Sequence, residues 1–122
     1  MTFAFRTAVS AATILMTALI PYADAAGPFD GTYAGTTTNT QAGGGAGCGA
    51  GGPGSRTVTD NVMTTQYASR DVRIKIGAGG IIDDSASIGP ALVSFKGKIT
   101  GNVMTYDITS QRCAFHFEGT KR

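Results

Sequence analysis

The chain contains no tryptophan, only two cysteines and one histidine, and charged residues make up just 15% of its 122 positions. A structural or catalytic zinc site needs a cluster of cysteine and histidine ligands, so the composition argues against metal binding. A phosphate-binding loop of the GxxxxGK[ST] type needs a lysine beside its glycines, and the first lysine is Lys75, well after the glycine-rich part. We therefore expect neither a metal nor a cofactor.

Catalytic groups are equally sparse. His116, the single histidine, alternates with apolar neighbours in a strand-like segment and is expected to face solvent beside Arg112 and Glu118. Asp83 and Asp84 are adjacent, and adjacent strand residues point to opposite faces of a sheet, which suits two solvated acids better than an acid and base pair. No residue is predicted to be catalytic, and we expect that the protein is not an enzyme.

Long hydrophobic runs are also absent. The longest run, residues 8–20, is shorter than the about 20 apolar residues that a transmembrane helix needs. Arg6 precedes this run and the small-residue triplet Ala23-Asp24-Ala25 follows it, which is the pattern of a secretory signal peptide. We predict cleavage after the triplet, so that residues 1–25 form the signal peptide and residues 26–122 form one β-domain. No membrane span is then left, and the protein is periplasmic or secreted.

The formal net charge is only +2, and acidic and basic residues are interspersed along the chain. A nucleic-acid-binding protein concentrates its basic residues together with stacking aromatics, so no nucleic-acid partner is expected. Four basic residues are expected to share an outward sheet face: Arg73, Lys75, Lys96 and Lys98. Such a face more often keeps strand edges soluble than binds an anionic partner.

Threonine, valine and isoleucine are abundant, and glycine, asparagine and aspartate interrupt them, a composition typical of strands and turns. In residues 71–76, DVRIKI, apolar and charged residues alternate with a period of two, which predicts a half-buried strand. Similar patterns predict about eight strands, at residues 32–38, 56–60, 62–67, 71–76, 81–87, 91–99, 103–108 and 112–120. Short connections, such as a hairpin at residues 77–80, favour a small antiparallel up-and-down β-barrel, because closure removes exposed edges. A two-sheet β-sandwich is the alternative.

One short pattern occurs twice, as TDNVMT at residues 59–64 and as TGNVMT at residues 100–105. Asp-Asn and Gly-Asn both tolerate the positive φ that tight hairpin turns require. Both copies therefore predict hairpins, with Met63 and Met104 in matching positions. An internal duplication is the alternative explanation.

Residues 42–55, AGGGAGCGAGGPGS, predict a glycine-rich loop that contains one cysteine. The composition also suits a disordered linker, but in an exported protein a lone pair of cysteines is more often joined than free. We therefore predict a disulfide between Cys48 and Cys113, with Cys113 inside the last strand. A closed loop of about 66 residues contributes roughly 4 kcal/mol when the stabilisation is calculated from chain entropy.

The inward-facing tyrosines and methionines are candidates to line a ligand pocket: Tyr33, Met63, Tyr67, Met104 and Tyr106. The alternative is that they fill the core, as side chains do in small barrels. Since catalytic groups are missing, we expect a monomeric binding module for a small ligand or an envelope protein. The alternative function is an inhibitor of a secreted or periplasmic hydrolase, because small disulfide-bonded barrels with exposed loops suit insertion into a cleft.

The segment GPFDGTYAGT at residues 27–36 and the closing RCAFHFEGTKR at residues 112–122 resemble a set of small exported proteobacterial proteins of unknown function. The resemblance implies a compact β-domain with one disulfide, and it implies no activity. Residues 30–33 also resemble the first strand of avidin-like and lipocalin-like barrels, which usually have a tryptophan near the position of Tyr33.

Overall fold

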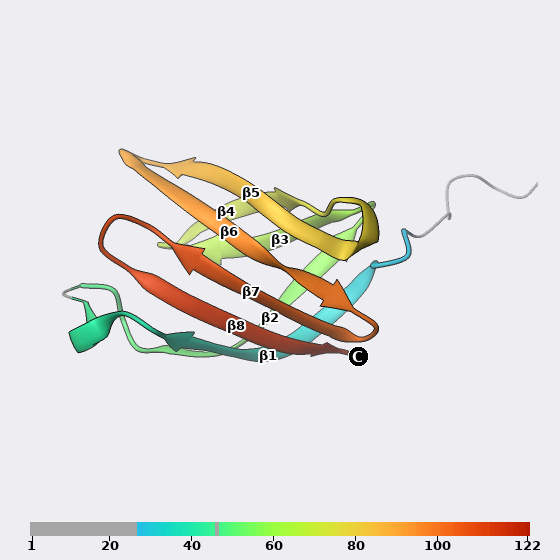
Figure 1. Ribbon diagram of the computed structural model, residues 1–122, viewed down its shortest axis with the longest axis horizontal. Coiled ribbons are helices and arrows are strands. Elements are labelled where there is room, and N and C mark those ends of the chain that lie inside the picture. The colour runs from blue at the N-terminus through green and yellow to red at the C-terminus, as the bar shows by residue number, and fades with distance from the viewer. Residues whose placement is uncertain (1–26, 46) are drawn as a thin grey trace, which may run out of the picture.

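The structure, a computed structural model, describes residues 27–45 and 47–122 (Figure 1). The expected signal peptide, residues 1–25, lies outside these residues. The described chain forms one sheet of eight antiparallel strands in the order β4-β3-β2-β1-β8-β7-β6-β5. The strands are β1 (Gly31–Asn39), β2 (Gly51–Thr59), β3 (Val62–Tyr67), β4 (Arg70–Lys75), β5 (Ile81–Ile88), β6 (Ala91–Thr100), β7 (Val103–Thr109) and β8 (Ala114–Lys121). In this part of the chain, no helix has the length and apolar character needed to cross a membrane.

The sheet curls into a nearly closed barrel. β1 is hydrogen-bonded to both β2 and β8, so the first and last strands lie side by side (Figure 1). At the opposite edges, β4 and β5 meet through one isolated bridge, between Ile76 and Ile82. The expected up-and-down β-barrel is therefore confirmed, as one sheet and not as two stacked sheets.

The seam between β4 and β5 differs from the expected hairpin. Residues 77–80 contain a short 3-10 turn, η3 (Ala78–Gly80), and the amide of Gly77 donates to the carbonyl of Ile81 over 2.8 Å. A carboxylate oxygen of Asp84 accepts a hydrogen bond from the backbone amide of Lys75, 3.1 Å away. On this edge of β4 no strand of the described chain pairs with the backbone, so the Lys75 amide would lack a backbone acceptor. The carboxylate of Asp84 accepts its hydrogen bond instead.

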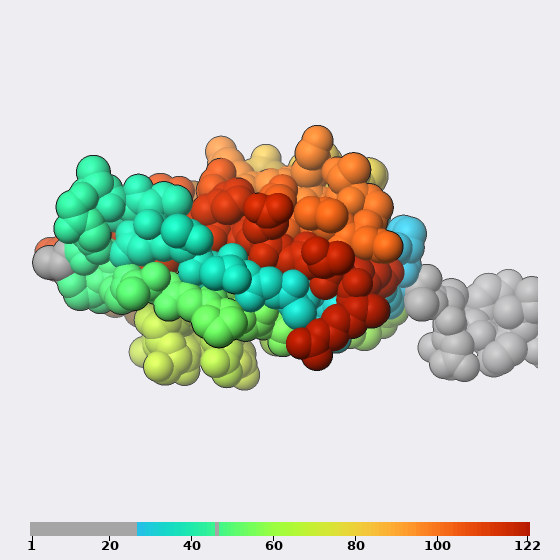
Figure 2. Space-filling view, turned by 90° about the horizontal axis from the view of Figure 1, so that it is seen from below, coloured from blue at the N-terminus to red at the C-terminus, as the bar shows by residue number. Residues whose placement is uncertain are grey.

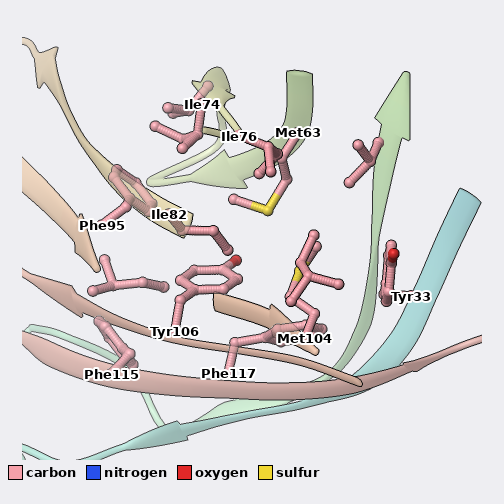
Figure 3. Packing of buried hydrophobic residues seen from close by; sticks show 14 of the residues in the cluster. Tyr33, Met63, Ile74, Ile76, Ile82, Phe95, Met104, Tyr106, Phe115 and Phe117 are labelled. Atoms are coloured by element: carbon pink, nitrogen blue, oxygen red, sulfur yellow. The ribbon is translucent and has the colours of Figure 1, made fainter. Parts of the chain in front are cut away.

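Inward-facing side chains from all eight strands fill the barrel with one hydrophobic cluster (Figure 3). In the middle of it, the ring of Tyr106 lies against those of Phe95 and Phe117. The ring centroids of Phe95 and Tyr106 are 6.1 Å apart, and those of Tyr106 and Phe117 are 5.3 Å apart. Aromatic pairs at such separations stabilise a core beyond the area they bury. The middle of the barrel is therefore packed with side chains.

The repeated sequence forms two hairpins, as predicted. Met63 and Met104 are both fully buried, each at the second position of the strand that follows its turn. Asp60 and Asn61 have φ of 51° and 61°, which identifies a type I′ turn. In the second copy only Gly101 has positive φ, 57°, as in a type II′ turn. The two copies thus reach the same packing through different turns.

The connection from β1 to β2 is shorter than the predicted glycine-rich loop. Residues 51–55 belong to β2 and pair with residues 34–38 of β1. Glycine permits this close approach, because a Cβ at Gly51 would overlap the carbonyl oxygen of Thr37. The remaining loop lies at one end of the molecule (Figure 2). The side-chain amide of Asn39 donates to two carbonyls of this loop, those of Gly44 at 2.8 Å and Gly49 at 2.6 Å.

The predicted disulfide between Cys48 and Cys113 is confirmed, and both residues pack against the core. Cys113, however, precedes β8 and does not lie inside it. Its amide donates to the hydroxyl of Ser110 over 3.1 Å, and its carbonyl accepts from the amide of Ser110 over 2.9 Å. Because the turn uses these backbone groups, they do not join the ladder, and β8 begins at Ala114.

Candidate functional site at the barrel mouth

The two ends of the barrel differ. At one end, Phe29 packs against the core, and its carbonyl accepts a hydrogen bond from the buried hydroxyl of Tyr33, 2.8 Å away. At the other end, residues of the β1–β2 loop, the β3–β4 turn and the β7–β8 loop line a pocket of about 440 Å³. We call it the mouth pocket; the residues that matter most are Thr37, Arg56, Tyr67, Ile108, Phe115 and the disulfide.

One wall of the mouth pocket is apolar and well fixed. Ile108 and Phe115 are only 5% and 8% exposed, so most of each side chain is held by the core. The ring of Tyr67 stands edge-on to that of Phe115, with centroids 6.4 Å apart, and its hydroxyl donates to Ser110 over 3.3 Å. The disulfide lies beside them. This wall offers an apolar contact surface in a defined position.

Arg56 supplies the charge of the mouth pocket, and its side chain points into the barrel. Its Nε donates to the hydroxyl of Tyr106 over 2.6 Å, and its Nη2 donates to the hydroxyl of Thr37 over 3.0 Å. Its Nη1 donates to the carbonyl of Ser55 over 3.2 Å. The guanidinium carbon lies 4.3 Å from the centre of the Phe117 ring, a cation–π contact. These contacts from four strands fix the orientation of the guanidinium.

The positive charge of Arg56 has no acidic partner. Among the described residues, no carboxylate oxygen lies within 4.0 Å of its guanidinium nitrogens. An arginine side chain keeps its proton in proteins, and burying a charge is costly unless an opposite charge or hydrogen bonds compensate it. Hydroxyls, a carbonyl and a ring face contact this half-buried cation, and no acidic side chain of the described residues pairs with it. The mouth pocket therefore has a fixed positive charge.

A second hollow, between β2 and β3, is also lined by Arg56. β2 and β3 pair only over residues 57–59 and 62–64 and then separate. The hollow beyond is lined by Arg56 and by Thr65, which is 4% exposed. In the described part of the chain, the hydroxyl oxygen of Thr65 is buried and has no hydrogen-bond partner. Buried polar atoms are usually satisfied, so this hydroxyl is a notable exception next to the cation.

The structure separates the five predicted pocket residues into two groups. Tyr67 lines the mouth pocket, and Tyr106 reaches it through its hydrogen bond with Arg56. The other three are 0% exposed and belong to the packed core: Tyr33, Met63 and Met104. Only the residues near the open end thus have a place in the candidate site.

Arg56 is not among the residues that the sequence singles out, although a signal for it exists. Arg56 is two positions before Val58, and alternate residues of a strand share a face. Val58 is 2% exposed and faces the core, so the same period places Arg56 inside the barrel. A lone basic residue on an apolar strand face was the available clue.

His116 and Asp83 face outward as predicted, whereas Asp84 is half-buried and accepts a hydrogen bond from the Lys75 amide, so it is not the freely solvated acid expected. The imidazole Nδ1 of His116 lies 2.7 Å from a carboxylate oxygen of Asp107 on the outer surface, and the His116 side chain is 38% exposed. Asp83 is exposed, while Asp84 faces the seam, so the two acids point to opposite sides. The four basic residues predicted to share an outward face are exposed and alternate with buried or half-buried residues in β4 and β6, so they lie on the outer face. Within residues 27–45 and 47–122, no group of three or more metal-ligating side chains is placed to hold a metal ion.

Comparisons of the chain with protein-family models, with curated proteins and with solved structures found no match.

Proposed function

We propose that the protein is an exported, non-catalytic binding module that holds a small ligand in the mouth pocket. The observation that carries this proposal is the contrast between the two ends of the barrel. At one end Phe29 packs against the core, whereas the other end opens into a pocket of about 440 Å³ that contains Arg56, a cation with no acidic partner among the described residues. Small-molecule sites are typically clefts of about 300–1,000 Å³ with apolar walls and a few placed polar groups.

The disulfide supports both export and a preformed site. Disulfides persist in oxidising compartments such as the periplasm and the extracellular space. Here the bond joins the β1–β2 loop to the β7–β8 loop, and both loops line the mouth pocket. A loop that is fixed before binding loses less conformational entropy when a ligand arrives, which favours affinity.

Native mass spectrometry of the full chain, exported by its host and purified without denaturation, tests the proposal. We expect a disulfide-bonded protein with extra mass that disappears on denaturation. If the protein arrives bare, titration with the apolar fluorophore 1-N-phenylnaphthylamine follows, and saturable binding at one site is expected. A bare protein that also fails to bind the fluorophore would rule out the proposed pocket function.

Two variants locate the binding. Tyr67→Ala removes part of the apolar wall, and we expect it to weaken fluorophore binding several-fold. Leu92→Ala removes a large apolar side chain on β6 that is 62% exposed, and it serves as the control. Equal losses in both variants would indicate nonspecific adsorption to the outer surface and would contradict binding at the mouth.

A further inference from the structure

We infer that the mouth pocket selects ligands with a single carboxylate, which Arg56 binds while an apolar tail lies along Tyr67, Ile108 and Phe115. This inference rests on the proposed binding function and adds the chemical class of the ligand. Three features of the site carry it: the unused donors of Arg56, the missing counter-charge and the unpaired hydroxyl of Thr65.

The guanidinium of Arg56 has donors to spare. A guanidinium carries five N–H groups in a rigid planar fork. Three of them are directed at Tyr106, Thr37 and the carbonyl of Ser55. Two N–H groups remain, one on each terminal nitrogen. A fork with one donor on each terminal nitrogen is the geometry in which arginine binds both oxygens of a carboxylate.

The charge balance favours one negative charge on the ligand. Among the described residues that line the mouth pocket, Arg56 is the only basic one and none is acidic. Asp71, the acidic residue at the adjoining hollow, accepts a hydrogen bond from the side-chain amide of Gln66 at 3.2 Å and forms no ion pair with Arg56. A carboxylate would neutralise the site, whereas a doubly charged phosphate monoester would leave one negative charge uncompensated.

Thr65 offers a further donor in the adjoining hollow, which Arg56 also lines. Its hydroxyl is buried next to Arg56 in the hollow between β2 and β3, without a partner among the described residues. A hydroxyl has one hydrogen to donate, and an anionic oxygen is a strong acceptor for it. A ligand carboxylate, or a water held by that carboxylate, would accept hydrogen bonds from both Arg56 and Thr65. This would remove the cost of leaving the buried Thr65 hydroxyl unpaired.

The apolar wall determines the rest of the ligand. Tyr67, Ile108 and Phe115 line the mouth pocket on the side of the β3–β4 and β7–β8 connections, and they offer carbon surface beside the charged group. A ligand that placed only a small ion on Arg56 would leave this surface in contact with water. A carboxylate with a short hydrocarbon tail would cover both the guanidinium of Arg56 and the apolar wall.

The experiment compares decanoate, 1-decanol and decyl phosphate by titration calorimetry on the full, disulfide-bonded protein. We expect decanoate to bind at least tenfold more tightly than 1-decanol, because hydrogen bonds to a charged group are lost with the alcohol. In Arg56→Gln we expect this preference to disappear, while 1-decanol binds as before. Arg73→Gln, which removes an exposed charge on the outer face of β4, is the matched control and should keep the preference.

The outcomes separate the inference from the function on which it rests. If none of the three compounds binds the wild-type protein, the proposed pocket function fails. Equal binding of decanoate and 1-decanol keeps the pocket and overturns the role of Arg56. Tighter binding of decyl phosphate than of decanoate would show that the ligand class is a phosphate and not a carboxylate. If Arg73→Gln loses the preference for decanoate over 1-decanol and Arg56→Gln keeps it, the anion binds on the outer face and not in the mouth pocket.

A measurement on the wild-type protein covers the case in which Arg56→Gln does not fold. In NMR spectra of protein with ¹⁵N-labelled arginine, the Nε–H resonance of Arg56 is the one that disappears in Arg56→Lys, a variant that keeps the charge. Decanoate should shift this resonance, while those of the exposed arginines on β4 stay in place. A saturating decanoate titration that leaves the Arg56 resonance unmoved overturns the inference.

Discussion

The Nε of Arg56 on β2 lies 2.6 Å from the hydroxyl oxygen of Tyr106 on β7, although β1 and β8 lie between these strands in the sheet. The hydrogen bond therefore crosses the interior of the barrel. It joins a charged side chain at the mouth to a tyrosine that is 1% exposed in the aromatic core. The packed interior and the candidate site are thus parts of one contact network.

The first prediction concerns this hydrogen bond. We expect Tyr106→Phe to lower the free energy of unfolding by about 1.5–3 kcal/mol, because it removes an acceptor from a charged donor. In an Arg56→Met background the same substitution should cost much less, so the double-mutant cycle gives a coupling free energy of about 1 kcal/mol or more. Urea unfolding of the four proteins measures it. Additive effects of the two substitutions would contradict a direct interaction.

The second prediction concerns the disulfide. Replacing both cysteines, Cys48→Ser with Cys113→Ser, should lower the free energy of unfolding by up to about 4 kcal/mol, because the bond closes a loop with a sequence separation of 65. A reducing agent should destabilise the wild-type protein by a similar amount and leave the double variant unchanged. Equal unfolding midpoints for the oxidised and reduced wild-type protein would oppose this role.

The third prediction concerns the β3–β4 turn, in which Ala68 and Ser69 have φ of 50° and 64°. This type I′ geometry favours Asn-Gly, and the left-handed region costs other residues roughly 1–2 kcal/mol. The pair of substitutions Ala68→Asn and Ser69→Gly should stabilise the protein by about 1 kcal/mol and raise Tm by about 4 °C or more. As a control, Asp60→Ala in the first type I′ turn should lower Tm. An unchanged Tm in the Asn-Gly variant would show that this turn is not strained.

The fourth prediction concerns the close approach of β1 and β8. A Cβ at Gly35 would overlap the carbonyl oxygen of Glu118, while a Cβ at Gly54 would meet only the Nη1 of Arg56, at 3.4 Å. Because overpacking displaces backbone, we expect Gly35→Ala to cost about 1–3 kcal/mol and Gly54→Ala much less. Thermal unfolding distinguishes them, and equal stability of the two variants would refute the argument.

The fifth prediction concerns pH. The backbone amide of Asp60 donates to the carboxylate of Asp30 over 3.1 Å, and that of Asn61 does so over 3.4 Å. These hydrogen bonds, led by that of Asp60, hold the pKa of Asp30 below its ordinary value of 3.8. A lowered folded-state pKa stabilises the protein above the ordinary value, and this stabilisation is lost as the pH falls through the folded value.

Asp30→Asn removes the carboxylate, so the wild-type protein should be the more stable of the two at neutral pH. The difference in urea midpoint should shrink as the pH is lowered below 3.8. A difference that stays constant across this range would show that ionisation of Asp30 does not contribute.

Much of the fold follows from local pattern. The alternation in residues 71–76 and the repeated turns at residues 60–61 and 101–102 predict strands and hairpins directly, because each pattern depends on neighbouring residues alone. The seam between β4 and β5 is different. The sequence near residues 77–80 suits a hairpin, and only the curvature of the whole sheet decides that these two strands separate.

The candidate site was harder to predict for a related reason. Tyr33, Met63 and Met104 have the residue types and the inward orientation of pocket residues, yet the neighbours that cover them come from distant strands. Whether an inward-facing side chain fills the core or lines a pocket depends on its height along the barrel axis. Arg56 faces inward like them, but it lies near the open end, and no local sequence pattern reports that position.

The pairing of β1 with β8 has a consequence for the order of assembly. The second edge of β1 (Gly31–Asn39) stays uncovered until β8 (Ala114–Lys121) is made, because β8 is its partner there. Until then β1 presents unpaired amides and carbonyls along that edge, and such edges template intermolecular pairing. Contacts between segments far apart in the sequence also slow folding. The growing polypeptide thus exposes this edge of β1 until β8 has emerged and paired with it.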